Sequence, residues 1–213
     1  MTTCCVLFPV NTFGHEMYYT GSAPNYNPIS LVWDTRINGK AYLKVDTHLL
    51  NNFYDDYYTA AVSAWPNAST CVTASYSNFS DSNLDLVTAT ESYWDTNFAS
   101  IANWVYGYCQ NVSTDGYTIS NATIAKNCSR RIAYAAIYYT PYTDSFKEGI
   151  WPWSGYDTTY VKKVMVHEIG HALGLGHPDK DYYPTSDASV MTSHSTTYWT
   201  PQTHDIKDLE YKY

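Results

Sequence analysis

The chain has 213 residues, of which 45% are hydrophobic and 15% charged, so it is long enough to bury the core of one domain. Its formal net charge of -8 leaves no basic surplus for neutralising phosphates, which argues against nucleic acid as a partner. Apolar runs such as 164–166 are far too short to span a membrane, so we expect a soluble protein, and a monomer. Its 23 tyrosines, beside many Asn, Ser and Thr, favour a secreted, extracellular protein.

The first predicted elements are two strands and a long helix. Residues 29–34 and 41–47 have the β-branched and aromatic enrichment of strands, with Asn38-Gly39 as a turn between them. From Leu50 to Trp65 apolar side chains recur at helical spacing, and Pro66 is expected to end this helix.

Further strands and a second long helix follow. Strands are expected over 71–76, 84–89, 101–109 and 132–140, the first of which alternates apolar with polar side chains. The second helix begins near 157–159, where Asp157, Thr158 or Thr159 can cap it, and continues to Leu173. Strands with one early and one late helix predict an α+β fold, with a layered α/β fold as the alternative.

The cysteines leave two readings open. A Cys109–Cys128 disulfide is the preferred pairing, and the alternative is that the thiols are reduced and buried. The five cysteines are Cys4, Cys5, Cys71, Cys109 and Cys128. Glycosylation sequons, which carry glycans only if the source is eukaryotic, begin at Asn67, Asn78, Asn111, Asn121 and Asn127.

A histidine-rich motif in the second long helix predicts a metal site. Its sequence is His-Glu-Ile-Gly-His, beginning at His167. His167 and His171 lie one helical turn apart, so both imidazoles can bind one metal ion. A catalytic zinc site has three protein ligands and a water molecule. Glu168 is expected to lie beside that water, rather than on the metal, and to act as the general base.

The residues after this motif supply the third expected ligand. Gly174 can end the helix in a left-handed turn, after which the chain reverses and His177 reaches the metal. A bare His-Glu-x-x-His also arises by chance in proteins without zinc. The extension to Gly174 and His177, followed by a methionine at Met191, argues against that reading.

This pattern resembles the signature of the metzincin metallopeptidases, His-Glu-x-x-His-x-x-Gly-x-x-His followed by a methionine-containing turn. Ser189-Val190-Met191 looks like that turn, and the resemblance implies that Met191 packs beneath the histidines without binding the metal. Among metzincins the chain is most similar to the matrixins, because 205–213 resembles their closing helix and Tyr213 matches its final tyrosine.

The resemblance implies a fold and an activity. The fold is a single catalytic domain over 1–213: an N-terminal extension (1–24), an upper lobe (about 25–174) with a twisted mixed sheet, a backing helix and the active-site helix, and a lower lobe (about 175–213) below the cleft. The activity is that of an endopeptidase with one catalytic zinc ion, acting on proteins or peptides. Extended substrate would pair with an edge strand near 104–108, and the expected contacts are Trp104, Tyr106 and His194.

Three departures from the matrixin pattern limit the resemblance. The segment 141–156 lacks their recognisable second zinc and calcium ligands, so no second zinc is expected; Asp144, Glu148 and Asp157 are the calcium candidates. Pro178 replaces the usual serine after the third histidine, and 192–195 lacks the usual Pro-x-Tyr, so cleavage specificity is not predicted. The Cys4-Cys5 pair lacks the surroundings of the matrixin propeptide cysteine.

Two other functions compete with the peptidase interpretation. The first is a non-catalytic, zinc-stabilised binding or adhesion module, for which a tyrosine-rich surface would suit stacking on sugars or peptides. Glu168 argues against it, because a structural zinc site has no use for a base. The second is a gluzincin-type peptidase, in which a distant glutamate replaces His177 as the third ligand.

Overall fold

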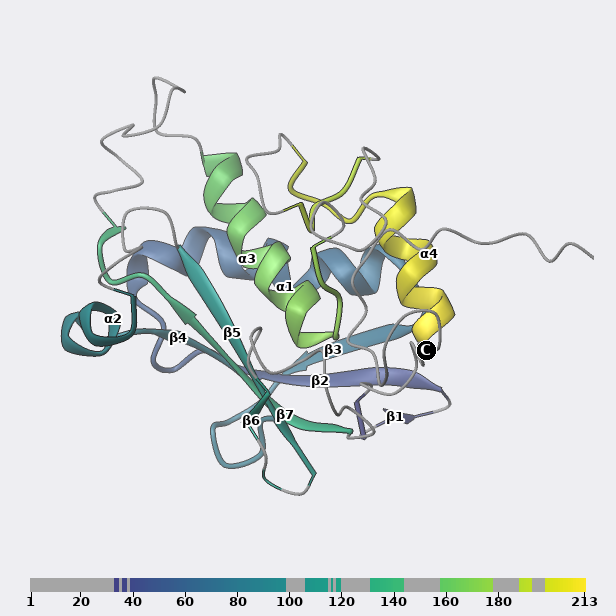
Figure 1. The fold of residues 1–213 in the computed structure, drawn as a ribbon, viewed down its shortest axis with the longest axis horizontal. Coiled ribbons are helices and arrows are strands. Elements are labelled where there is room, and N and C mark those ends of the chain that lie inside the picture. Colours follow the sequence, from purple (N-terminus) through teal and green to yellow (C-terminus); the bar gives the residue numbers. More distant parts are fainter. Residues whose placement is uncertain are drawn as a thin grey trace, which may run out of the picture.

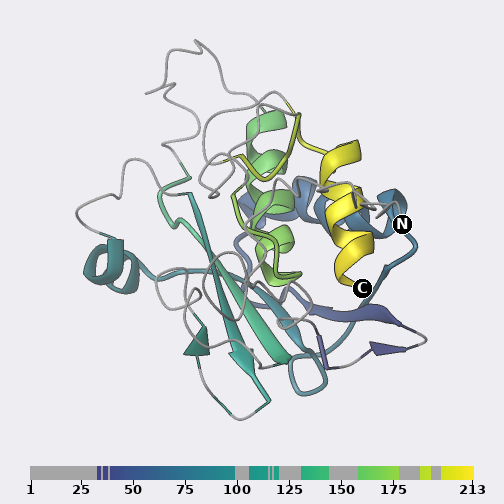
Figure 2. The ribbon, with the colours of Figure 1, turned by 45° about the vertical axis from the view of Figure 1, so that its right-hand side comes forward.

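The described part of the chain is a mixed sheet with helices packed on one face (Figure 1). The computed structural model describes residues 33–34, 36–37, 39–98, 106–114, 116, 118–119, 131–143, 158–177, 188–192 and 198–213. Helices α1, α3 and α4 lie on the same side of the sheet, and α2 lies apart from them at one end (Figure 2). This arrangement confirms the α+β class. The division into lobes and the role of 1–24 stay predictions.

The sheet combines parallel and antiparallel pairs. Its strands are β1 (Arg36–Ile37), β2 (Lys40–Asp46), β3 (Val72–Tyr76), β4 (Leu84–Thr88), β5 (Gly107–Ser113), β6 (Thr118–Ile119) and β7 (Ile132–Tyr139). Their order is β1-β2-β4-β7-β5-β6, with β3 also paired to β2. β2 is parallel to β3 and β4, and β4 to β7, whereas β5 is antiparallel to β6 and β7.

Four predicted strands are confirmed to within a residue or two: 41–47, 71–76, 84–89 and 132–140. The turn before the first of them is also confirmed, because Gly39 has a φ of 79° between β1 and β2. Most of the predicted strand 29–34 lies outside the described residues, although Trp33 forms a parallel bridge with Ile132.

The strand predicted over 101–109 ends too early, and residues 101–105 lie outside the described part of the chain. The observed strand β5 begins at Gly107 and ends at Ser113. Its helix-facing side chains include Asn111 and Ser113, which are polar and yet buried. Hydrophobic periodicity cannot detect a strand whose buried positions are polar.

The helices are α1 (Asp55–Ala68), α2 (Glu91–Phe98), α3 (Thr158–Ala172) and α4 (Thr203–Lys212), and a short 3₁₀ turn at Asn52–Tyr54 precedes α1. The prediction that Pro66 ends the first helix is wrong, because Pro66 lies in its last turn. Proline removes only its own N–H from the helix, and the Ser69 N–H still donates to the Trp65 carbonyl (2.9 Å). No helix in the described residues is long and apolar enough to cross a membrane.

Helix α2 was not predicted. Its buried residues, Trp94 and Phe98, are one turn apart, and with Ala89 they form a small cluster separate from the main core. Tyr108 and Tyr138 on the outer side of the sheet pack against this cluster. The helix has only two buried positions, which is too few for a periodic signal.

Helix α3 is buried on nearly every side. The Trp65 indole of α1 donates a hydrogen bond to the Val166 carbonyl, and the Trp33 indole donates to the Ala172 carbonyl (both 3.0 Å). The same core cluster includes Met191 and Leu209 from the C-terminal segments. The sheet, α1 and the C-terminal segments therefore hold α3 in place, together with the histidine motif that it carries.

Candidate metal centre

The C-terminal end of α3 reverses the chain as the sequence predicts. Gly174 has a φ of 82°, the left-handed conformation that a side chain disfavours. The Gly174 N–H donates to the His171 carbonyl (2.9 Å), and the Leu175 N–H donates to the Gly170 carbonyl (3.0 Å). This is the hydrogen-bond pattern of a Schellman motif. It directs the following residues back along the helix, so that His177 faces His167 and His171.

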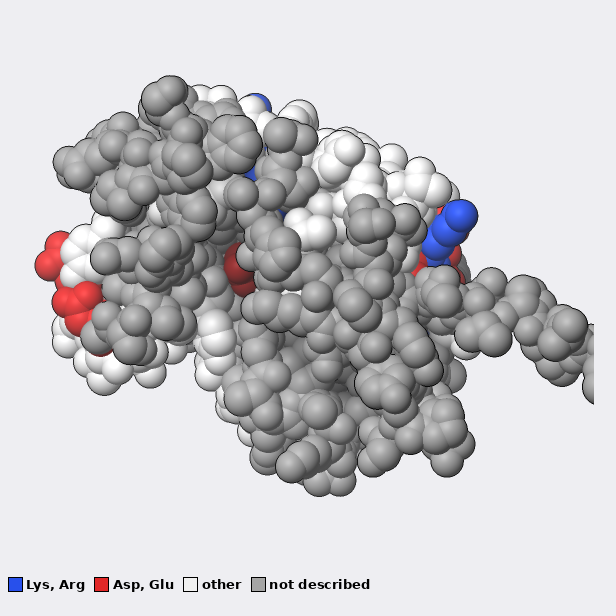
Figure 3. Space-filling model, turned by 45° about the horizontal axis from the view of Figure 1, so that its top comes forward, with Lys and Arg blue, Asp and Glu red and all other residues white. Residues whose placement is uncertain are grey.

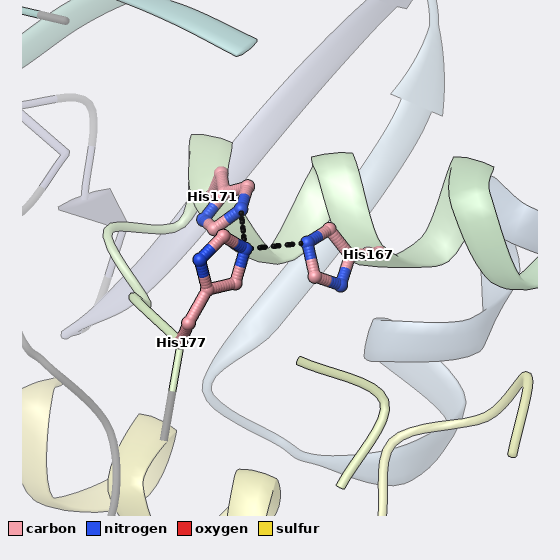
Figure 4. Close-up of side chains that lie close together, drawn as sticks. All are labelled: His167, His171 and His177. Carbon is pink, nitrogen blue, oxygen red and sulfur yellow. Dashed lines mark hydrogen bonds between the residues drawn. The ribbon is translucent and has the colours of Figure 1, made fainter. Parts of the chain in front are cut away.

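The three histidines converge through their Nε2 atoms (Figure 4). The Nε2 atom of His177 lies 2.9 Å from that of His167 and 3.1 Å from that of His171. Within the described residues, these are the one group of three or more His, Cys, Asp or Glu side chains whose ligand atoms are close enough to share an ion.

The hydrogen bonds of the imidazoles fit a bound cation. The Nδ1 atom of His167 lies 2.9 Å from the Val190 carbonyl oxygen, and that of His171 lies 2.7 Å from the Leu175 carbonyl oxygen. Because a carbonyl only accepts, each Nδ1 carries the proton and each Nε2 presents a lone pair. A single proton on the His177 Nε2 could form a good hydrogen bond with only one of the two lone pairs, that of His167 or that of His171. A metal ion, in contrast, can accept the lone pairs of all three Nε2 atoms. This tautomer is the one that binds zinc.

The surroundings of His167 also favour its neutral form. Burial lowers the pKa of His167 well below its usual value, and the charge of Lys163, one turn earlier on α3, lowers it further. A neutral imidazole is the form that a metal ion requires.

Glu168 follows His167 on α3 and lies on the side of the helix that faces β5. Its carboxylate accepts a hydrogen bond from the Cys109 N–H. Burial raises the pKa of Glu168 to about 8, although the charge of Lys163 and the Cys109 N–H act in the opposite direction. A Cβ atom on Gly107 would lie 2.6 Å from the Glu168 Cγ, so only glycine lets the strand approach this side chain so closely.

Met191 packs against α3 between the two helical histidines. A Cβ atom on Gly170 would lie 2.3 Å from the Met191 Sδ and 2.8 Å from the Trp65 Cζ2. Met191 is fully buried. The contact at Gly170, between His167 and His171 in the sequence, agrees with the packing role expected of this methionine.

Several contacts around the site were not predicted from the sequence. The carboxylate of Asp205 at the start of α4 accepts hydrogen bonds from the Ser189 hydroxyl and the Val190 N–H. The Lys163 Nζ lies 3.4 Å from the Thr192 carbonyl oxygen. The sequence predicts the methionine turn and the closing helix as separate motifs. Neither motif predicts that the two are in contact.

The expected substrate contacts are only partly described. Tyr106 is 7% exposed and its ring packs edge-on against Tyr160, at 5.3 Å between centroids. This placement suits core packing better than contact with substrate. Trp104 and His194 lie outside the described residues, as do the calcium candidates Asp144, Glu148 and Asp157.

Two expectations about β5 change. Cys109 is a free, buried cysteine, so the preferred bridge from Cys109 to Cys128 is wrong, and the alternative of a buried thiol holds for this residue. Asn111 begins a glycosylation sequon but is 2% exposed, and its Nδ2 donates to the His171 carbonyl (3.1 Å). Its side chain supports the second histidine of the motif and is not available for a glycan in the folded protein.

Comparison with known proteins identifies a family. The family model described as matrixin, a peptidase family, matches residues 67–210. The matched segment extends from the last turn of α1 into α4, and therefore includes the histidine cluster, Glu168 and Met191. A comparison with curated proteins found no match for this chain.

Proposed function

Because the chain belongs to the matrixin family of peptidases, we propose that it is a zinc-dependent endopeptidase in which His167, His171 and His177 bind the zinc ion and Glu168 is the general base. The family implies zinc-dependent cleavage of proteins. The observations that support these residue roles are the convergence of three Nε2 atoms and the buried carboxylate of Glu168, the residue after His167.

The proposed mechanism assigns the proton transfers to Glu168. Zinc in this site would polarise the scissile carbonyl and lower the pKa of the attacking water. Glu168 takes a proton from that water and passes it to the leaving amine. Burial raises the pKa of Glu168 to about 8, which suits a group that must accept and release a proton near neutral pH. The Cys109 N–H orients the carboxylate.

We expect an extended substrate to pair with the start of β5, where the resemblance places the edge strand. Gly107–Gln110 pair with β7, and β6 pairs with β5 at Asn111 and Val112. A peptide bound at such an edge forms main-chain hydrogen bonds with the strand. Gly107 and Cys109 of this strand contact Glu168, so a peptide lying along it would pass close to the proposed base.

Substitution of Glu168 tests the proposal. Zinc-loaded wild-type protein and Glu168→Ala are compared on a diverse peptide library, with zinc content measured in both. We expect Glu168→Ala to retain zinc and to lose activity by about 10²- to 10⁴-fold, the usual contribution of a general base. Glu210→Ala, on an exposed position of α4, is the matched control and should cleave like the wild type.

The same experiment distinguishes the competing functions. Equal, background hydrolysis by the wild type and Glu168→Ala would favour the zinc-stabilised binding module. Four large tyrosines are exposed among the described residues and could serve such a module: Tyr76, Tyr142, Tyr198 and Tyr211.

An acidic surface lies at one end of the described part of the chain. On the face shown in Figure 3, acidic side chains gather at the end of the molecule occupied by α2. This helix contains Glu91 and Asp95, and no phosphate-binding surface is expected beside such charges.

We also propose an extracellular location, because the composition is rich in Tyr, Asn, Ser and Thr. Recovery of the protein from cells but never from the medium would contradict this location.

A further inference from the structure

A continuous series of hydrogen bonds connects the buried carboxylate of Asp205 to the first histidine of the motif. The Ser189 hydroxyl donates to the Asp205 Oδ1 (2.5 Å), and the Met191 N–H donates to the Ser189 Oγ (2.8 Å). The carbonyl on the other side of that same peptide bond belongs to Val190, and it accepts from the His167 Nδ1 (2.9 Å).

All the hydrogen bonds in this series point the same way. His167 donates to the peptide group, the peptide group donates to the hydroxyl, and the hydroxyl donates to the carboxylate. Hydrogen bonds that follow one another in this way polarise each other, so each donor and acceptor is stronger than it would be alone. The negative charge of Asp205 therefore acts on the imidazole even though the two side chains are not in contact.

Burial keeps this effect from being screened by water. Asp205 is fully buried, Ser189 is 1% exposed, and Val190 and Met191 are fully buried. The second carboxylate oxygen of Asp205 accepts from the Val190 N–H (3.0 Å) and the Gln202 N–H (2.6 Å). These two bonds fix the carboxylate between the methionine turn and the start of α4.

His171 provides a contrast within the same site. Its Nδ1 donates directly to the Leu175 carbonyl, and the N–H of that peptide group belongs to Gly176. The series through Ser189 ends on the His167 Nδ1, whereas the His171 Nδ1 donates to a different peptide group, so a change at Ser189 acts first on His167. A hydrogen-bond acceptor on the outer nitrogen of a metal-binding histidine strengthens its bond to the metal.

We propose that Ser189 and Asp205 are positioning residues of the metal centre, which strengthen zinc binding by His167 through the peptide bond between Val190 and Met191. The inference rests on the proposed zinc site but not on peptidase activity. It assigns a role to the first residue of the methionine turn and to the closing helix, beyond the packing of Met191.

Zinc affinity and the imidazole proton signals test this role. In Ser189→Ala the series is broken, while the two backbone bonds to Asp205 remain. We expect the dissociation constant for zinc, measured by competition with a chelator, to rise by about 10- to 100-fold, as for other partners of metal-binding histidines. In the NMR spectrum of the zinc-loaded protein, the His167 Nδ1 proton should move upfield and that of His171 should stay in place.

Two further variants separate this role from a general loss of packing. Ser69→Ala removes the hydroxyl of another buried serine, which accepts from the Cys71 N–H outside the metal centre, and should bind zinc like the wild type. Asp205→Asn should weaken zinc binding, and adding Ser189→Ala in the Asp205→Asn background should cause little further loss. Independent roles would instead give additive losses.

The outcomes distinguish this inference from the proposed function. Unchanged zinc affinity and an unmoved His167 signal in folded Ser189→Ala would overturn the role of Ser189 and Asp205. That result would not contradict the proposed peptidase function. Equal movement of the His167 and His171 signals would also overturn it, since a general disturbance would then be the cause. A wild type that binds zinc but cleaves nothing would overturn the proposed function alone. If Ser189→Ala does not fold, Asp205→Asn gives the same two readouts.

Discussion

The close approach of β5 to α3 makes Gly107→Ala an informative substitution. A Cβ atom at this position would lie 2.6 Å from the Glu168 Cγ, and 3.1 Å from its Cδ and Oε1. Non-bonded carbon atoms prefer a separation of about 3.5–4.0 Å, so the Glu168 side chain or the strand must move by about 1 Å. Gly107 does not have a positive φ, so alanine causes no backbone strain and the effect is steric.

A displacement of about 1 Å at a reacting group can reduce the rate about 10²-fold. We therefore expect kcat/KM of Gly107→Ala to fall by about two orders of magnitude, equivalent to about 2.7 kcal/mol of transition-state stabilisation. Zinc content should stay at the wild-type level, because the three histidines are not affected. The assays are hydrolysis of a fluorogenic peptide that the wild type cleaves, metal analysis, and thermal unfolding to verify folding.

Gly116→Ala is the control for this substitution. Its Cβ atom would meet nothing within 4 Å, but its φ of 77° disfavours alanine. It should lose about 1–2 kcal/mol of stability and keep its activity. Near wild-type activity in a folded, zinc-loaded Gly107→Ala would refute the reasoning, because Glu168 would then not depend on this contact.

Three further predictions follow from the same region. His177→Ala should lose its zinc on dialysis against a weak chelator, because a catalytic zinc site has three protein ligands; wild-type zinc content would support a distant glutamate as the third ligand. Gly170→Ala should lower the melting temperature, because its Cβ atom would lie 2.3 Å from the Met191 Sδ and 2.8 Å from the Trp65 Cζ2, and overpacking costs about 1–3 kcal/mol; an unchanged melting temperature would contradict this packing. In metal-free protein, the Glu168 carboxyl has a pKa of about 8 when folded against an ordinary value of 4.5, so the folded state holds a proton that the unfolded state has released. The contribution of this group to the free energy of unfolding therefore falls as pH rises between these values, and urea unfolding of the wild type and Glu168→Gln at a series of pH values should show that fall in the wild type alone.

The parts of the fold that were predicted correctly depend on patterns within one segment. The strands at 84–89 and 132–140 are dominated by apolar side chains that face the core, and the turn at Gly39 needs a residue that tolerates a positive φ. The predictions were wrong where the bounds of an element, or the residues that it buries, depend on contacts with another segment of the chain. Helix α1 continues past Pro66, where the Ser69 N–H still donates to the Trp65 carbonyl, and β5 buries Asn111, whose amide reaches the His171 carbonyl.

The metal centre shows the same division. The two histidines one turn apart, the acid after the first of them and the glycine that reverses the chain toward His177 could be predicted from the sequence, because each depends on the geometry of a few consecutive residues. No sequence pattern predicts that the Cys109 N–H faces Glu168, or that Asp205 reaches the methionine turn. These contacts join residues far apart in the chain, and the packing of whole strands and helices, rather than any local spacing, brings them together.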